Sequence, residues 1–198
     1  LIFVTVDPVG ACTVGTADEQ NTVTGALLSC VGPAGPNNGI WQLIIAANSS
    51  PLDYYYTNTA SSIATYLQAT ATPFTPKTTL TFAALGIGVD PVQNWATNAG
   101  VPGLATLPSG TYTQHIHALK SAGGNATLHT QFWEVSSTGV DIAMIGQTEE
   151  SGTLTGAEAE YTLEFVDANV YTFQTANSRV VGRVFATVTG FAATVQIF

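Results

Sequence analysis

The sequence predicts an all-β fold, built as an antiparallel sandwich or barrel. Strand formers such as Thr, Val, Tyr, Phe and Ile are abundant, whereas the helix formers Lys, Arg, Glu and Met are scarce. About eight short strand patterns follow one another at regular spacing, with polar turns between them. Hydrophobic residues make up 45% of the 198 residues, which is enough to fill the core of such a domain.

The regular pattern occupies residues 79–198. The expected strands are 79–86, 110–120, 126–135, 139–147, 159–166, 170–175, 179–187 and 193–198. Tyr161, Leu163 and Phe165 alternate with polar residues, which places their side chains on one face of a strand. The strand at 179–187 is apolar on both faces, as is typical of a central or intersubunit strand.

Residues 1–78 are less regular, and we expect them to form an N-terminal arm or a small β extension. The expected strands there are 1–6, 25–31 and 40–47. Pro73 and Pro76 indicate an extended linker that ends this region before the domain at 79–198. Two short segments, 62–69 and 91–99, have the composition of helices.

The charge composition excludes several partners. Charged residues are 9% of the chain, against about 25% in ordinary soluble domains. Four basic and thirteen acidic residues give a formal net charge of −9, so we expect no nucleic-acid partner and no attraction to anionic membranes. No apolar run reaches the ~18 residues of a membrane span, and we expect no membrane insertion. A surface rich in Thr, Ser, Asn and Gln suits packing against identical neighbours.

The two cysteines of the chain are candidates for a disulfide bond. Cys12 and Cys30 bracket a Gly- and Thr-rich segment, and a loop of that size gains about 3 kcal/mol from closure. The alternative is a pair of buried thiols that pack as small apolar side chains. The extracellular character of the composition favours the disulfide.

The three histidines form a candidate metal site. His115 and His117 are two residues apart on an expected strand, so both side chains project from one face. If the turn at 121–125 closes a hairpin, His117 lies directly opposite His129. Three imidazoles suit zinc or a similar metal, and a threefold axis would gather such side chains from three subunits. The alternative is a set of hydrogen-bonded or surface histidines, and we expect no resident cofactor.

Aromatic residues form the second candidate site. They would serve as a platform for a sugar or a protein partner, or they would pack in the core or between subunits. These residues are Trp41, Tyr54, Tyr55, Tyr56 and Trp95.

Two further positions are candidates for glycosylation. Asn48 and Asn125 each begin an Asn-X-Ser/Thr triplet, which is the acceptor pattern for an N-linked glycan in a eukaryotic secretory route.

Acidic residues cluster towards the C-terminal half. Paired carboxylates can bind calcium or hydrolyse glycosides, but no calcium-loop pattern accompanies these, and solvated carboxylates are the simpler interpretation. The cluster consists of Glu149, Glu150, Glu158, Glu160, Glu164 and Asp167. No Gly-x-Ser-x-Gly motif occurs, and neither cysteine has a neighbouring histidine, so we expect no enzymatic activity.

Several stretches of residues 79–198 resemble, in order, motifs of jelly-roll proteins from phage and virus surfaces, of the tail-fibre or capsid-surface type. They are the Pro-Gly segment at 100–112, the strand and turn at 128–139, the short segments at 148–151 and 159–162, and the strand at 177–186. The resemblance implies an antiparallel jelly-roll β-sandwich, often trimeric and exposed on a particle. His-x-His pairs occur in that family as axial metal sites, which supports the interpretation of His115 and His117 as ligands.

The sequence therefore predicts a structural protein of a virion surface or of another extracellular location. It would be a tail-fibre head or a capsid-surface or decoration subunit that assembles with itself, with a trimer favoured. Its other partners would be virion proteins and a host glycan or receptor. The alternative is a secreted carbohydrate-binding β-sandwich module.

Overall fold

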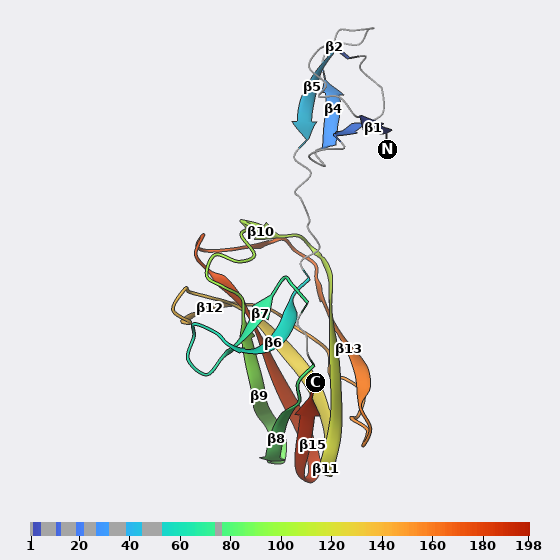
Figure 1. The fold of residues 1–198 in the computed structure, drawn as a ribbon, viewed down its shortest axis with the longest axis vertical. Helices are drawn as coiled ribbons and strands as arrows, with labels where there is room; N and C mark the ends of the chain where they lie inside the picture. The colour runs from blue at the N-terminus through green and yellow to red at the C-terminus, as the bar shows by residue number, and fades with distance from the viewer. Residues whose placement is uncertain are drawn as a thin grey trace. The chain divides into compact units, whose positions relative to one another are not determined.

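The structure is a computed structural model that describes residues 2–4, 11–12, 19–21, 27–31, 39–44, 53–73 and 77–198. The chain divides into two compact units, Leu1–Leu52 and Asp53–Phe198 (Figure 1). The sequence pattern placed the boundary between the N-terminal region and the main domain after residue 78. In the structure, the two strands between 55 and 70 join the sheet of the larger unit. The linker was expected at Pro73 and Pro76, whereas the strands at 55–60 and 67–70 before it already belong to the larger unit.

The first unit contains one five-stranded sheet. Its strands are β1 (Ile2–Val4), β2 (Ala11–Cys12), β3 (Glu19–Asn21), β4 (Leu27–Val31) and β5 (Gly39–Ile44). Their order is β1-β3-β4-β5-β2, and β1 pairs parallel with β3 while the other pairs are antiparallel.

The second unit is also built from strands, and the described residues contain no helix. Its strands are β6 (Tyr55–Ala60), β7 (Leu67–Thr70), β8 (Leu80–Leu85), β9 (Gly88–Ala96), β10 (Thr106–Leu107), β11 (Gly110–Val135), β12 (Asp141–Gln147), β13 (Ala159–Asp167), β14 (Tyr171–Thr172) and β15 (Arg179–Ile197). The all-β sandwich prediction is confirmed, and the strand pairs of this unit are antiparallel except β7 with β9, which is parallel. The jelly-roll connectivity stays a prediction. The helices expected at 62–69 and 91–99 are wrong, because residues 67–69 belong to β7, residues 91–96 belong to β9, and the rest of both segments is not helical. In the described part of the chain, no helix is long and apolar enough to cross a membrane.

Two long strands, β11 and β15, form the framework of this unit. They pair antiparallel from Ala118 opposite Ile197 to Val135 opposite Arg179. The edge of β11 that faces away from β15 forms backbone hydrogen bonds with β12, with residues 148–155 and with β13. The other edge of β15 is covered by β8 and β9, and β7 and β6 extend the sheet beyond β9. The pattern at 179–187 indicated a central or an intersubunit strand, and β15 is central, between β11 and β9.

Both long strands bend, and the bend makes the sandwich. Ile116 and Ala118 before it and Ala126 and Leu128 after it belong to one buried cluster. All four residues occupy even positions, so the same face of β11 points inward in both halves. Register shifts within 120–125 mark the bend, and Figure 1 shows β11 and β15 turning back at the lower end of the view. The two halves of each strand therefore lie in facing layers.

The hairpin expected at residues 121–125 is wrong, because β11 bends there instead. The chain does reverse there, but the segments 110–120 and 126–135 pack face to face across the core and do not pair edge to edge. Gly123 and Gly124 permit this arrangement, because a Cβ at either position would overlap the backbone of β15 at Ala192 or Phe191. Close contact between two backbones thus replaces a hairpin turn.

Candidate functional site

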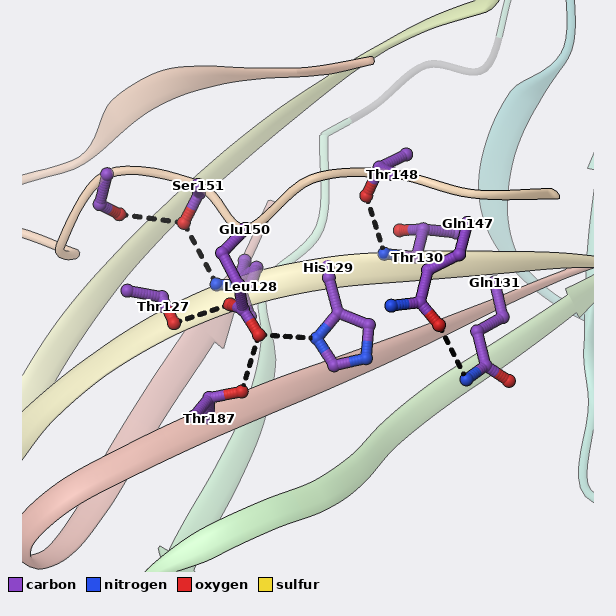
Figure 2. Close-up of polar contacts among 11 residues, drawn as sticks. Thr127, Leu128, His129, Thr130, Gln131, Gln147, Thr148, Glu150, Ser151 and Thr187 are labelled. Atoms are coloured by element: carbon purple, nitrogen blue, oxygen red, sulfur yellow. Dashed lines mark hydrogen bonds and ion pairs between the residues drawn. The ribbon is translucent and has the colours of Figure 1, made fainter. Parts of the chain in front are cut away.

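The most developed polar cluster lies on the outer face of the second half of β11. Even residues of β11 point into the core, so Thr127 and His129 point outward. Their cross-strand partners on β15 are Thr187 and Phe185. Glu150, from the segment after β12, reaches over this face. We call Thr127, His129, Glu150 and Thr187 the His129 cluster (Figure 2).

The carboxylate of Glu150 is the centre of the His129 cluster. Its Oε1 lies 2.8 Å from Nδ1 of His129 and accepts a 2.6 Å hydrogen bond from the Thr187 hydroxyl. Its Oε2 accepts a 2.5 Å hydrogen bond from the Thr127 hydroxyl. The side chain of His129 is 7% exposed and stacks on Phe185, with ring centroids 5.2 Å apart. One carboxylate therefore joins β11, β15 and the crossing segment.

Two hydroxyl groups hold the segment that carries Glu150 in place. Oγ of Ser151 accepts a 2.9 Å hydrogen bond from the backbone N–H of Leu128, and Oγ1 of Thr148 accepts one of 2.9 Å from the N–H of Thr130. These side chains replace the carbonyl groups that a regular strand would offer to β11. The irregular segment is thereby fixed against β11, which explains why Glu150 can reach Thr187 on the next strand (Figure 2).

The hydrogen bonds also set the ionisation of Glu150. Partial burial acts to raise the pKa of its carboxyl group, but the hydrogen bonds from Thr127 and Thr187 and the neighbouring His129 outweigh burial and lower it. The carboxylate is therefore the stable form at neutral pH. Since three donors already occupy it, its arrangement suits holding strands together rather than taking a proton from a substrate.

The polar face continues along β11 beyond the His129 cluster. Nε2 of Gln131 donates a 3.0 Å hydrogen bond to Oε1 of Gln147, and Nε1 of Trp133 donates to Oε1 of Gln131 at 3.1 Å. The guanidinium of Arg183 lies 4.9 Å from the centre of the Trp133 ring and pairs with Asp141. The Gln131–Gln147 and Arg183–Trp133 contacts link neighbouring strands, the Trp133–Gln131 bond lies within β11, and the Arg183–Asp141 pair joins β15 to β12 across β11.

The structure does not bring the three histidines together, so the single patch of His115, His117 and His129 is wrong. His115 and His117 lie before the bend in β11 and His129 lies after it. Because the inner faces of the two halves meet in the core, their outer faces point away from each other. Among the residues that the structure describes, no group of three His, Cys, Asp or Glu side chains could hold a metal ion.

His115 and His117 do share one exposed face, as their spacing predicted. Nδ1 of His115 lies 2.8 Å from Oε1 of Glu160, and His117 lies 3.3 Å from Glu158 and 3.5 Å from Glu160. Lys77 also pairs with Glu158, and the hydrogen bond from Lys77 is the largest cause that lowers the pKa of this carboxyl group. A metal site shared between subunits at His115 and His117 stays a prediction.

The expected aromatic platform is for the most part inside the protein. Tyr56 and Trp95 stack with their ring centroids 4.4 Å apart, and Trp95 is 1% exposed. Tyr54 packs against the same core, while Tyr55 is exposed. The ligand-binding interpretation is therefore wrong for Tyr56 and Trp95, because the alternation of β6 and β9 turns both rings inward. The side chain of Trp41, in β5, lies outside the described residues.

The remaining candidates from the sequence are the two cysteines and the two glycosylation positions. Cys12 lies in β2 and Cys30 in β4, and both strands pair with β5. Their side chains and Asn48 lie outside the described residues, so the disulfide and this glycosylation site stay predictions. Asn125 is exposed at the bend of β11, where the chain was expected to form a turn.

A buried carboxylate that sequence reasoning missed lies on the inner face of β11. Glu134 has no exposed surface and accepts hydrogen bonds from the hydroxyl of Tyr171 (2.6 Å), the N–H of Gln174 (2.9 Å) and the hydroxyl of Ser178. It anchors the loop between β14 and β15. Its partners are 37 to 44 residues away, so the only available signal was an acidic residue at a core-facing position of a strand.

An acidic cleft lies between the end of β12 and β13. It has a volume of about 420 Å³, and a Cβ on Gly146 would collide with the ring of Phe165. The cleft is lined by Ile145, Gly146, Gln147, Glu149, Glu164, Phe165, Val166 and Asp167. Glu149 and Glu164 are exposed there, in agreement with the expectation of solvated carboxylates.

No protein-family model matches the chain, and no curated protein matches it. Among solved structures, that of the infectious bursal disease virus Gx strain is similar with a TM-score of 0.30 and 8% sequence identity. The match covers 87% of this chain and 41% of that chain, so this chain spans less than half of the viral chain's length.

Proposed function

We propose that the chain is a non-enzymatic structural subunit of a virion surface, as a tail-fibre head or a capsid-surface or decoration protein. It assembles with copies of itself, with a trimer favoured, and contacts other virion proteins and a host receptor or glycan. The motifs at 100–112 and 177–186 support the virion assignment through their resemblance to phage and virus surface proteins.

The observation that carries the assembly part of this proposal is apolar exposure on a surface of low charge. Eight large hydrophobic side chains are between 40% and 73% exposed in the larger unit, while charged residues are 9% of the chain. The exposed residues are Tyr55, Ile87, Val89, Val140, Met144, Val166, Val170 and Phe191. Contact with other protein surfaces removes such side chains from water.

The polar clusters support a structural role in the same way. The carboxylates of Glu134 and Glu150 each accept several hydrogen bonds from their own chain. Both join segments that are far apart in sequence, and neither offers a free carboxylate beside a cleft. Their geometry stabilises a rigid sandwich, which is what a subunit of a shell or fibre needs.

The mass of the full chain in solution tests the proposal. Light scattering coupled to size-exclusion chromatography is expected to give a stable homo-oligomer, with a trimer as the favoured species. A mass of one chain at every accessible concentration would contradict the assembly proposal. Decoration of purified particles by antibodies against the chain would then separate a virion subunit from another secreted oligomer.

A further inference from the structure

One end of the larger unit combines four neighbouring segments. Leu85 pairs with Ala193 and Gly88 pairs with Val188, so residues 86–87 lie beside 189–192. Asn125 pairs with Thr189, which places the bend of β11 next to the same part of β15. We call this end the corner surface. It consists of residues 86–89, 121–125, 152–157 and 189–192, and it lies where the labels β8, β11 and β15 meet in Figure 1.

The corner surface exposes three large apolar side chains. Ile87 is 70% exposed, Phe191 is 66% exposed and Val89 is 59% exposed. Ile87 lies in the turn between β8 and β9, Val89 lies on β9 and Phe191 lies on β15, and the pairings of β15 with β8 and β9 place these segments side by side. Within the described residues, the other valines more than half exposed lie elsewhere, with Val140 in the turn before β12, Val166 on β13 and Val170 between β13 and β14.

The four segments carry no ionisable side chain. The nearest charged residues in the sequence are Asp90, Lys120 and Glu158, each directly beyond the end of a segment. One carboxyl oxygen of Asp90 is buried and lies beside Gly86, at the margin of the corner surface. The corner is therefore both apolar and free of charged groups of its own, although the whole chain carries a net charge of −9.

The backbone holds the corner surface in shape. Gly123 and Gly124 lie so close to residues 191–192 that a Cβ on either glycine would overlap their backbone atoms. Gly190 has a φ of +87°, which turns the chain just before Phe191. The backbone that carries Phe191 is thus packed, and a residue on packed backbone loses less conformational entropy on binding than one on a loose loop.

We propose that the corner surface is a contact site between two copies of this chain. This inference rests on the proposed function and names the surface that self-assembly uses. Copies that each carry a net charge of −9 repel one another, and the repulsion is smallest where both contact surfaces lack charge. In the favoured trimer, a patch that lies at the threefold axis meets the same patch of the other two copies, and an uncharged apolar patch is complementary to itself. The same net charge disfavours an anionic lipid surface as the partner.

The experiment compares the wild-type chain with the double variant Ile87→Ser and Phe191→Ser by sedimentation velocity over a range of concentrations. The double variant is expected to weaken self-association at least tenfold. Raising the salt concentration is expected to strengthen wild-type association, because salt screens the repulsion between the copies. The matched control is Val140→Ser with Val166→Ser, two exposed aliphatic residues away from the corner. This control is expected to associate like the wild type.

The outcomes separate the two proposals. A wild-type oligomer that both double variants leave intact overturns the corner contact and leaves self-assembly standing. A wild-type chain that remains a monomer overturns self-assembly itself. Flotation with neutral phosphatidylcholine vesicles adds a third result: binding by the wild type that Phe191→Ser abolishes assigns the corner to a lipid surface and also overturns the contact. An unchanged thermal unfolding midpoint of each variant shows that folding is intact.

Discussion

The hydroxyl group of Tyr171 donates a 2.6 Å hydrogen bond to Oε2 of Glu134, a side chain with no exposed surface. The other carboxylate oxygen accepts hydrogen bonds from the backbone of Gln174 and the hydroxyl of Ser178. One ionised group inside the sandwich therefore fixes the loop that leads into β15. The burial of this charge is tolerated because every donor around it is directed at the carboxylate.

Replacement of Glu134 by Gln is expected to lower the free energy of unfolding by about 3 kcal/mol, because an amide group offers one acceptor where three donors need two, and the charge is lost. Urea unfolding followed by tryptophan fluorescence measures the change. Glu164→Gln, at an exposed position of β13, is the control and should stay within about 0.5 kcal/mol of the wild type. Equal stability of Glu134→Gln and the control would contradict the anchoring role.

The protein is expected to lose stability in acid. Burial acts to raise the pKa of Glu134, but hydrogen bonds from Ser178, Tyr171 and the backbone outweigh it, so the pKa lies below its ordinary value of 4.5. The pKa of the Glu150 carboxyl group is lowered in the same way. A carboxyl group whose pKa is lowered by folding stabilises the fold at any pH above its unfolded-state pKa. This contribution is lost as the pH falls below 4.5 and through the folded-state pKa. Urea midpoints between about pH 3 and about pH 7 measure the loss, and Glu134→Gln should flatten the profile.

The His129 cluster gives a separate prediction. Glu150→Ala removes the acceptor of Thr127 and Thr187 and the partner of the buried His129, and it is expected to cost about 1–2 kcal/mol of unfolding free energy. Hydrogen exchange at the N–H groups of Leu128 and Thr130 should also become faster, because the crossing segment loses one of its attachments. Glu149→Ala alters the neighbouring exposed carboxylate and serves as the control. Identical exchange rates in both variants would show that Thr148 and Ser151 hold the segment without Glu150.

Sequence reasoning was most successful where a local pattern decides the structure. Tyr161, Leu163 and Phe165 alternate with polar residues, and β13 indeed turns Leu163 and Phe165 inward and leaves Thr162 and Glu164 exposed. The two-residue spacing of His115 and His117 likewise placed both side chains on one face. Period-two alternation follows from strand geometry alone, so no knowledge of distant partners was needed.

The failures came from contacts that the local pattern does not contain. Pro91 suggested the start of a helix, but it lies at a register shift in β9 opposite Phe185, while Val92 and Trp95 are buried in the sandwich. Gly123 and Gly124 signalled a turn correctly. They could not show whether the two flanking segments pair edge to edge or face to face, because both arrangements need a flexible reversal of the chain. The partners of Glu134 were invisible for the same reason.

Gly182 and Tyr56 are expected to be energetically coupled. A Cβ at position 182 would overlap Oη of Tyr56 and lie 3.1 Å from its Cζ, so Gly182→Ala should destabilise the fold by about 2 kcal/mol. Among the described residues, that hydroxyl is buried without a hydrogen-bond partner, so Tyr56→Phe alone should cost little. The double variant should recover about half of the loss, which a double-mutant cycle in urea measures. Strictly additive effects would show that the two groups do not meet.

Gly123 and Gly124 should be the glycines on which the bend of β11 depends most. A Cβ at either position meets the backbone of β15 at residues 189–193 and not the end of a flexible side chain, so neither strand can yield without losing its pairing. Gly124→Ala is expected to cost about 3 kcal/mol or more, and Gly123→Ala more still, because its φ of +92° adds backbone strain. Gly152→Ala is the matched control, since nothing lies within 4 Å of a Cβ placed there. Thermal and urea unfolding of the three variants measure the order. Wild-type stability of Gly124→Ala would mean that the two backbones lie further apart and that the halves of β11 are not folded over one another at this point.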